Sequence, residues 1–273
     1  MSHETSRRGT FCLLVRASHP EPTVAVTALA TALAWAADVS PRSILFLAVA
    51  VVAGQLSVGW SNDLLDAERD REVRRLDKPV ATGALTRSTV RGAIVGALVV
   101  AVAASLGVGL RPGLLHLGLV AVGWLYNLGL KRTLLSWLPY AVCFGLMPAV
   151  VTLAQRDPAF APAWMITAGA LLGVAAHLLN AVPDLAEDLR TGVCGFPHVL
   201  GTRASTDLAT LLMVAGSVVA VVGPPGAVGA SGYVALIVVG CLVVAGRLGR
   251  GLDPFRTAMA IAAVVVIALV LQS

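Results

Sequence analysis

Charged residues are scarce in this sequence. They make up 13% of its 273 residues, whereas a typical soluble domain has about 25%. Hydrophobic residues make up 57%, and the mean hydropathy is +0.84. A membrane-spanning barrel would need polar and apolar residues to alternate, but the sequence has long uninterrupted apolar runs instead, which favour helices in lipid. The sequence therefore predicts an all-α, polytopic membrane protein surrounded by membrane lipids.

Cysteine and aromatic residues are also few, and their placement argues against two kinds of function. The four cysteines lack the paired spacing of zinc sites and disulfide frameworks. Aromatic residues make up 5%, and no basic stripe with interleaved aromatic residues is present, so we expect no nucleic-acid partner. We attribute the net charge of +5 to membrane orientation.

Apolar runs of about 17 to 22 residues predict a bundle of about nine transmembrane helices within a single domain, residues 1–273. The runs lie near residues 22–38, 43–61, 91–110, 113–130, 134–154, 160–182, 207–223, 230–246 and 255–271. Arg111, Pro112 and Gly113 are expected to form the turn between the third and fourth runs.

Lysine and arginine are distributed unevenly between the two ends of these runs. The N-terminus and the connections after the second, fourth, sixth and eighth runs hold 17 of the 20 basic residues, and the remainder are Arg42, Arg111 and Arg156. Because basic connections stay in the cytoplasm, we expect a multi-pass protein of the cell membrane with a cytoplasmic N-terminus and an external C-terminus.

Nine of the 15 acidic residues lie in two short segments at the predicted cytoplasmic end. Each segment holds an Asp-rich motif, residues 62–70 and 180–188, with oxygen-bearing side chains at positions i, i+4 and i+8, which share one helix face. These side chains are Asn62, Asp66, Asp70, Asn180, Asp184 and Asp188. The constant offset of 118 residues predicts two four-helix pseudo-repeats with a site between them.

Carboxylate and amide oxygens are ligands that suit Mg²⁺, which is often shared with substrate phosphate groups. Two acidic faces would repel each other unless cations bridge them. Four basic residues suit phosphate: Arg75 and Lys78 follow the first motif, and Lys131 and Arg132 end the fourth run. The alternative is that the acids solvate helix ends and the basic residues only anchor the chain at the membrane surface.

The chain resembles the UbiA-type intramembrane prenyltransferases in four motifs: Asn62-Asp63-x-x-Asp66-x-x-x-Asp70, Lys78-Pro79-x-x-x-Gly83, Tyr126-Asn127-x-x-x-Lys131-Arg132 and Asp184-x-x-x-Asp188. The resemblance covers nearly the whole chain. It implies an isoprenyl diphosphate donor, Mg²⁺ held by the two Asp-rich motifs, and an acceptor that is aromatic or lipid-like. It also implies that diphosphate is bound by Arg75, Lys78, Lys131 and Arg132. Asn180 stands where many relatives carry another acid, which puts its role as a metal ligand in question.

In such a reaction the allylic C–O bond ionises, an acceptor attacks the cation, and a base removes a proton. Asp63 is expected to be that base or a partner of another site residue, and Tyr126 is expected to contact the substrate. Other aromatic residues that could face the cation are Trp60, Trp124 and Trp137. His177 is a second candidate base, although a lone histidine near a helix end is more often a hydrogen-bonded structural residue.

One alternative function remains open from the sequence, and a second is disfavoured. A membrane terpene cyclase on the same scaffold would ionise an isoprenyl diphosphate without an external acceptor. A transporter would normally place its charges near the middle of the bilayer, and the clustering of the acids at helix ends argues against it.

Overall fold

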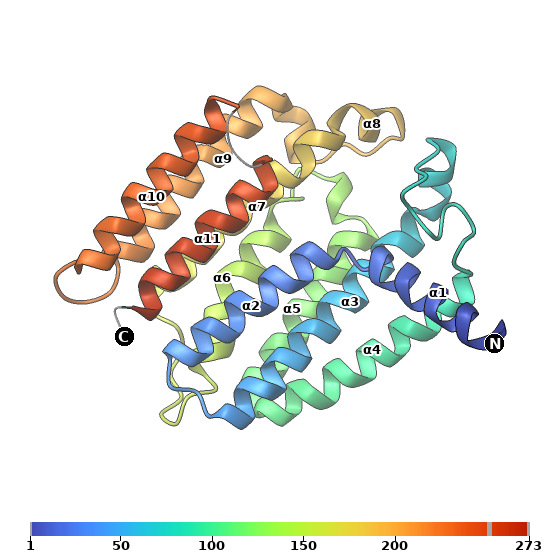
Figure 1. Cartoon of the computed structure of the whole chain (residues 1–273). Coiled ribbons are helices and arrows are strands. Elements are labelled where there is room, and N and C mark those ends of the chain that lie inside the picture. The colour runs from blue at the N-terminus through green and yellow to red at the C-terminus, as the bar shows by residue number, and fades with distance from the viewer. Residues whose placement is uncertain (1, 250–252, 272–273) are drawn as a thin grey trace.

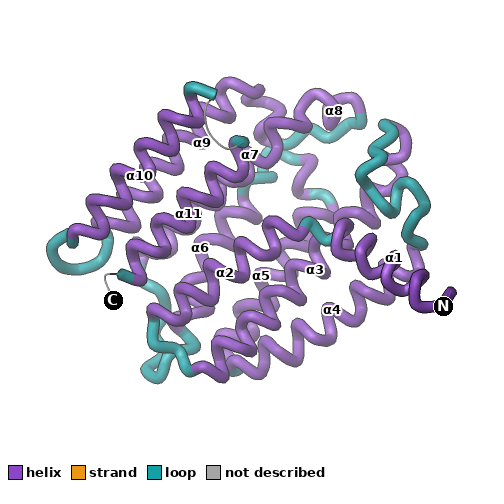
Figure 2. The backbone as a smooth tube through the Cα atoms, in the orientation of Figure 1, coloured by secondary structure: helices purple, strands orange, loops and turns teal. Residues whose placement is uncertain are grey.

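The computed structural model describes residues 2–249 and 253–271, which form a bundle of helices without a strand (Figures 1 and 2). The all-α prediction is confirmed for these residues. Residues 1, 250–252 and 272–273 of the predicted domain lie outside the described residues.

Nine of the helices in the described ranges overlap the nine predicted apolar runs, namely α2 to α7 and α9 to α11. The elements are α1 (Ser2–Ala17), α2 (Pro20–Ala36), α3 (Pro41–Glu72), α4 (Arg87–Val108), α5 (Leu110–Leu128), η1 (Leu130–Arg132), α6 (Leu138–Thr152), α7 (Ala163–Ala181), η2 (Val182–Asp184), α8 (Leu185–Arg190), α9 (Phe196–Val222), α10 (Ala230–Arg247) and α11 (Pro254–Val270). Five helical segments of the described chain are long and apolar enough to cross a membrane: α3, α4, α7 with its continuation to Arg190, α9 and α10. The helices α6 and α11 are apolar but shorter.

Helix α3 is longer than a membrane span requires. Its 32 residues correspond to about 48 Å at 1.5 Å per residue, whereas the hydrocarbon core of a bilayer is about 30 Å thick. The helix begins after Ser40, whose side chain accepts a hydrogen bond from the Ser43 amide at 3.2 Å. Its apolar first part therefore suffices to cross the membrane, and the first Asp-rich motif lies on the part that extends beyond.

The turn between α4 and α5 lies earlier than the sequence suggested. It consists of Gly109, whose φ of 145° favours glycine, whereas Arg111, Pro112 and Gly113 belong to α5. Proline is compatible with the first turn of a helix because the amide hydrogen it lacks would have no helical partner there. The prediction of a turn at residues 111–113 was therefore wrong.

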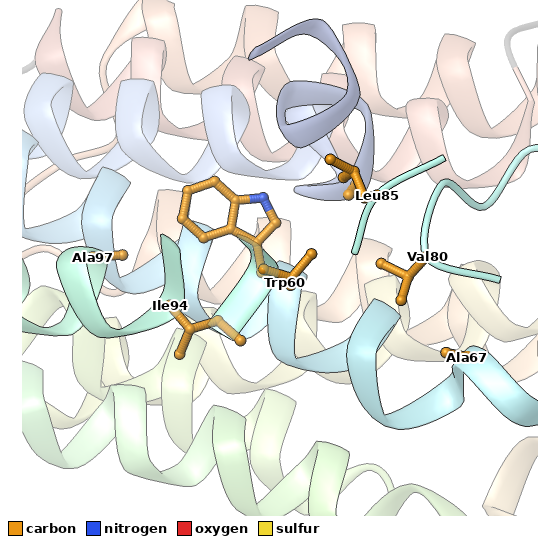
Figure 3. Close-up of a cluster of buried hydrophobic side chains, with 8 residues drawn as sticks. Trp60, Ala67, Val80, Leu85, Ile94 and Ala97 are labelled. Atoms are coloured by element: carbon orange, nitrogen blue, oxygen red, sulfur yellow. The ribbon is translucent and has the colours of Figure 1, made fainter. Parts of the chain in front are cut away.

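Residues 73–86 connect α3 to α4 and are anchored by apolar side chains. Val80 and Leu85 are buried in one cluster with Trp60 of α3 and side chains of α4 (Figure 3). The N-terminal helix α1 covers this cluster, and the Trp60 indole donates a hydrogen bond to the Leu14 carbonyl at 2.8 Å. This anchoring holds the basic residues of the connection close to the end of α3.

The two Asp-rich motifs lie at the same end of the bundle. Figure 1 shows the 73–86 connection in teal and α8 in gold at one end, while the connection between α9 and α10 lies at the opposite end. The prediction that both motifs emerge on one face is confirmed by this arrangement.

Candidate active site

A cavity of about 550 Å³ opens between the two Asp-rich motifs and extends among α2, α3, α5, α6, α7, α9 and α11. Ten of the twelve predicted site residues line it: Asn62, Asp66, Asp70, Arg75, Lys78, Tyr126, Lys131, Asn180, Asp184 and Asp188. The other two, Asp63 and Arg132, are not among the lining residues in the described part of the chain. Arg132 is exposed, in contrast to its neighbour Lys131.

Lys131 is buried against the first motif. Its Nζ donates to both carboxylate oxygens of Asp66, at 2.7 and 2.6 Å, and to Asn62 Oδ1 at 3.1 Å. Asp66 is 2% exposed and Lys131 is 7% exposed. Burial lowers the pKa of Lys131, and the Asp66 carboxylate acts in the opposite direction. The pair is thus a buried ion pair that closes one side of the cavity.

Asn127 positions Lys131 by tying α5 to α3. Its Nδ2 donates to the Val58 carbonyl and to Ser61 Oγ, each at 2.8 Å. The helix then ends, and the short η1 turn directs Lys131 into the cavity. Asn127 of the Tyr126-Asn127 motif therefore has a structural role, which is to hold the end of α5 against α3.

The second motif is not the regular helix that its spacing suggested. Helix α7 ends at Ala181, and the 3₁₀ turn η2 separates it from α8. Pro183 lies in this turn, and proline has no amide hydrogen to continue α-helical bonding. Asn180, Asp184 and Asp188 nevertheless all reach the cavity, so the interruption changes the backbone and preserves their common direction.

Arg69 connects the two motifs. One end of its guanidinium lies 3.2 Å from Asp66 Oδ2 and 3.5 Å from Asp70 Oδ1, and Nη1 lies 3.7 Å from Asp188 Oδ1. Arg69 is thus one cation that contacts carboxylates of both motifs. Sequence reasoning missed Arg69 because it looked like one more basic residue at a cytoplasmic helix end.

Arg75 makes a second connection between the segments. It donates two hydrogen bonds to Asp77, at 3.1 and 3.2 Å, and lies 3.6 Å from Asp184 and 3.5 Å from Glu187. The bond from Arg75 lowers the pKa of Asp77. Arg69 therefore links α3 to α8, and Arg75 links the 73–86 connection to the second motif.

Asp63 is not among the described lining residues, but it binds Lys78, which is. Its Oδ1 accepts a hydrogen bond from Lys78 Nζ at 2.8 Å, and the same Nζ lies 3.0 Å from His19 Nε2. Asp63 is 1% exposed. Of the two roles expected for Asp63, this geometry favours the partner of another site residue.

Aromatic side chains form the wall one turn deeper than the motifs. The ring of His177 lies 5.9 Å from that of Tyr126 and 4.8 Å from that of Tyr140, and Tyr140 stacks on Phe144 at 6.1 Å between centroids. The three tryptophans considered from sequence are absent from the lining residues described here. Trp60, for example, borders an apolar groove between α3 and α4.

The donor set fits a hard divalent cation. Within residues 2–249 and 253–271, no three His, Cys, Asp or Glu side chains are gathered closely enough to hold a metal ion. The carboxylates of both motifs instead approach Arg69, Arg75 and Lys131. Oxygen ligands that face one cavity and already attract cations have the chemistry that Mg²⁺ prefers.

The apolar helices are those of an integral membrane protein, and a cavity lined by acidic and basic side chains lies at one end of them. A sequence model of the UbiA prenyltransferase family matches residues 23–270, and the chain belongs to this family. A comparison with curated proteins gave no match.

Solved structures show the same fold at low sequence identity. The chain is similar to the apo form of a UbiA homolog from Aeropyrum pernix K1 at 16% identity and a TM-score of 0.75, covering 92% of this chain and 98% of that one. It is similar to a UbiA homolog from Archaeoglobus fulgidus bound to GPP and Mg²⁺ at 15% identity and a TM-score of 0.68, covering 96% and 100%. It is also similar to a digeranylgeranylglyceryl phosphate synthase at 14% identity and a TM-score of 0.67, covering 96% and 98%.

Proposed function

We propose that this protein transfers an isoprenyl group from an isoprenyl diphosphate to an aromatic or lipid-like acceptor, releases diphosphate, and requires Mg²⁺. The observation that carries the proposal is the convergence of both Asp-rich motifs on one cavity, with basic side chains between them. Family membership and the solved homolog with GPP and Mg²⁺ support it.

The polar end of the cavity would hold the metal-bound diphosphate. Asp66, Asp70, Asp184 and Asp188 would coordinate Mg²⁺, with Asn62 and Asn180 adding amide oxygens. Bound Mg²⁺ would neutralise the negative charge that develops on the diphosphate as the allylic C–O bond breaks. Arg75, Lys78 and Lys131 already line this end and would bind phosphate oxygens through charge-assisted hydrogen bonds.

The apolar end of the cavity would hold the isoprenyl chain. Helix α2 contributes Val26 and Leu29 to the lining, and α11 contributes Ala258, Met259 and Ala262. Tyr126 lies between the two ends and would contact the allylic carbon, where an aromatic face stabilises positive charge. The limited access of water would protect the cation from hydrolysis.

The site would lie on the cytoplasmic side of nine spans built from two pseudo-repeats. A shift of 118 residues takes Pro20–Ala36 to 138–154, close to α6, and takes Leu110–Leu128 to 228–246, close to α10. The same shift relates Ala37 to Gln155, whose Nε2 donates to the Ala37 carbonyl at 2.8 Å. A contact between equivalent positions is what a two-fold pseudo-axis between repeats produces.

A matrix of substrates tests the function. The purified protein would be incubated with isoprenyl diphosphates of increasing length and with phenolic or lipid acceptors, with and without Mg²⁺, and products would be identified by mass spectrometry. We expect a prenylated acceptor only with Mg²⁺. A hydrocarbon formed without an acceptor would favour a terpene cyclase, and the absence of diphosphate release under every condition would refute both activities.

A further inference from the structure

His177 is a buried histidine of the cavity wall, and one of its ring nitrogens has no hydrogen-bond partner among the described residues. It is 2% exposed, lies on α7 one turn before Ala181, and lines the cavity. Its Nδ1 has no hydrogen-bond partner among the described residues. An unsatisfied buried polar atom costs about 1–3 kcal/mol, so an unpaired ring nitrogen in a substrate cavity calls for a ligand.

The other ring nitrogen is held by a buried serine. Ser136 Oγ lies 3.0 Å from His177 Nε2 and accepts a hydrogen bond from the Phe196 amide, also at 3.0 Å. Ser136 is fully buried, and a Cβ added at Gly195 would lie 2.9 Å from its Oγ, so the hydroxyl has little room to move. When Nε2 carries the ring proton and donates it to Ser136, Nδ1 keeps a lone pair that no described residue binds.

The other candidate bases differ from His177 in their position or in the charged groups beside them. Asp63 is bound to Lys78 and lies outside the lining, and Asp66 is bound to Lys131. His198 Nδ1 accepts a hydrogen bond from the Gly195 amide. Its Nε2 has no hydrogen-bond partner among the described residues, but it lies 3.4 Å from the Asp188 carboxylate, at the level of the Asp-rich motifs. His177 lies instead between Tyr126 and Tyr140, deeper than the Asp-rich motifs, where the allylic carbon would lie beyond the diphosphate.

We propose that His177 is the base of the transfer reaction and that the acceptor carries a hydroxyl group whose proton moves to Nδ1. This inference rests on the proposed function. The bond between the allylic carbon and the diphosphate oxygen breaks, and its electron pair leaves with diphosphate. A carbon or oxygen of the acceptor supplies the pair for the new bond, and the O–H bond gives its proton to Nδ1. Ser136 acts as a positioning residue that orients the ring.

Two measurements on the full-length protein with Mg²⁺ separate ionisation from transfer. Scrambling of ¹⁸O from the bridging position of labelled geranyl diphosphate reports ionisation and return without an acceptor. Transfer is measured with 4-hydroxybenzoate, 1-naphthol and glycerol monooleate as acceptor probes. We expect His177→Gln to scramble label within about threefold of the wild type and to lose transfer by about 100-fold or more, the range of general base catalysis.

Matched variants distinguish chemistry from folding. His116 is another buried histidine, bonded to Ser105 at 2.8 Å and outside the cavity lining described here, so His116→Gln should retain both activities. Ser136→Ala should lower transfer by about tenfold because the ring loses its orientation while the base remains. Added imidazole should restore part of the transfer in His177→Ala, which a structural defect would not allow.

The possible outcomes have different meanings. Transfer by His177→Gln within threefold of the wild type would overturn the assignment of the base. Label scrambling by the wild type without transfer to any of the three probes would overturn the hydroxyl-bearing acceptor. A wild type that does not scramble label with Mg²⁺ would refute the proposed function itself.

Discussion

Arg69 Nη1 lies 3.7 Å from Asp188 Oδ1 and thereby joins helix α3 to α8 across the mouth of the cavity. The side chain is 20% exposed, so water screens its charge only in part. Because it also contacts Asp66 and Asp70, a single cation neutralises acids from both motifs. This arrangement predicts that Arg69 and a bound metal ion compete for the same carboxylates.

Replacement of Arg69 by alanine should make stability more dependent on Mg²⁺. Without the guanidinium the carboxylates repel one another, and we expect unfolding without divalent ions to become easier by about 2 kcal/mol, the scale of hydrogen bonds to charged groups. Mg²⁺ should then raise the melting temperature more than it does for the wild type. Arg74→Ala, at an exposed position of the same segment, is the control. An equal effect of Mg²⁺ on all three proteins would show that Arg69 and metal do not share these carboxylates.

The pair of Asp66 and Lys131 should behave as one unit in a double-mutant cycle. Removal of one partner leaves the other charge buried, which destabilises a protein by about 3–5 kcal/mol. We expect Asp66→Asn and Lys131→Met each to lower the free energy of unfolding by about 3 kcal/mol. The double variant should lose clearly less than the sum. Additive losses, measured by denaturant unfolding in detergent, would contradict a direct ion pair. The single and double variants should all be inactive.

Arg75 and Arg132 were both predicted to bind diphosphate, and the structure places them differently. Arg75 lines the cavity, whereas Arg132 is exposed and outside the described lining. We expect Arg75→Gln to lower kcat/KM for the isoprenyl diphosphate by about 10- to 100-fold, or about 1.4–2.7 kcal/mol of transition-state stabilisation. Arg132→Gln should stay within about threefold of the wild type. A large loss in Arg132→Gln would restore the assignment made from the sequence.

The sequence did not indicate that Lys131, and not its neighbour Arg132, enters the cavity. The apolar runs were predictable because the bilayer imposes a length on each span, and the spacing of the first Asp-rich motif follows from helix geometry. Which of two adjacent basic residues enters the cavity depends on the η1 turn, which leaves no periodic signal. Tyr140 was not anticipated for a similar reason, because its position opposite His177 depends on how α6 packs on α7.

The interruption of the second motif had a visible signal. Pro183 lies between Asn180 and Asp184, and a proline inside a helical pattern breaks the hydrogen-bond ladder. The role of Arg69 had no such signal, since a basic residue at a cytoplasmic helix end is expected from orientation alone. Its function became evident only when Asp188, far away in the sequence, was placed beside it.

Close packing of α6 on α7 should be needed to keep this aromatic wall. A Cβ at Gly173 would lie 2.6 Å from the Tyr140 carbonyl oxygen and 2.7 Å from Phe144 Cβ, so Gly173→Ala should destabilise the protein by about 1–3 kcal/mol. Gly118→Ala is the matched control, since nothing lies within 4 Å of the added atom. It should be neutral or stabilise by up to about 1 kcal/mol through helix propensity. Equal melting temperatures for the two variants would contradict the close contact.

The orientation in the membrane can be tested at two positions that flank α7. Cys194 is exposed beside the second motif, and Arg156 is exposed on the connection between α6 and α7. If α7 crosses the bilayer with the site on the cytoplasmic side, these two positions lie in different compartments. In a background with serine at the other cysteines, a membrane-impermeant maleimide should label Arg156→Cys (with Cys194→Ser) in intact cells and native Cys194 only in inside-out vesicles.

Each alternative pattern of labelling has a distinct physical meaning. The reverse pattern would show that the 17 basic residues of one set face outward, against the orientation that the charge asymmetry predicts. Labelling of both positions from one side would show that α7 does not span the bilayer, although its apolar segment continues to Arg190. An α7 that returned to the same side would also bring residue 156 to the mouth of the cavity. It lies instead beyond the far end of α6, one helix length from Lys131, and this separation favours opposite compartments.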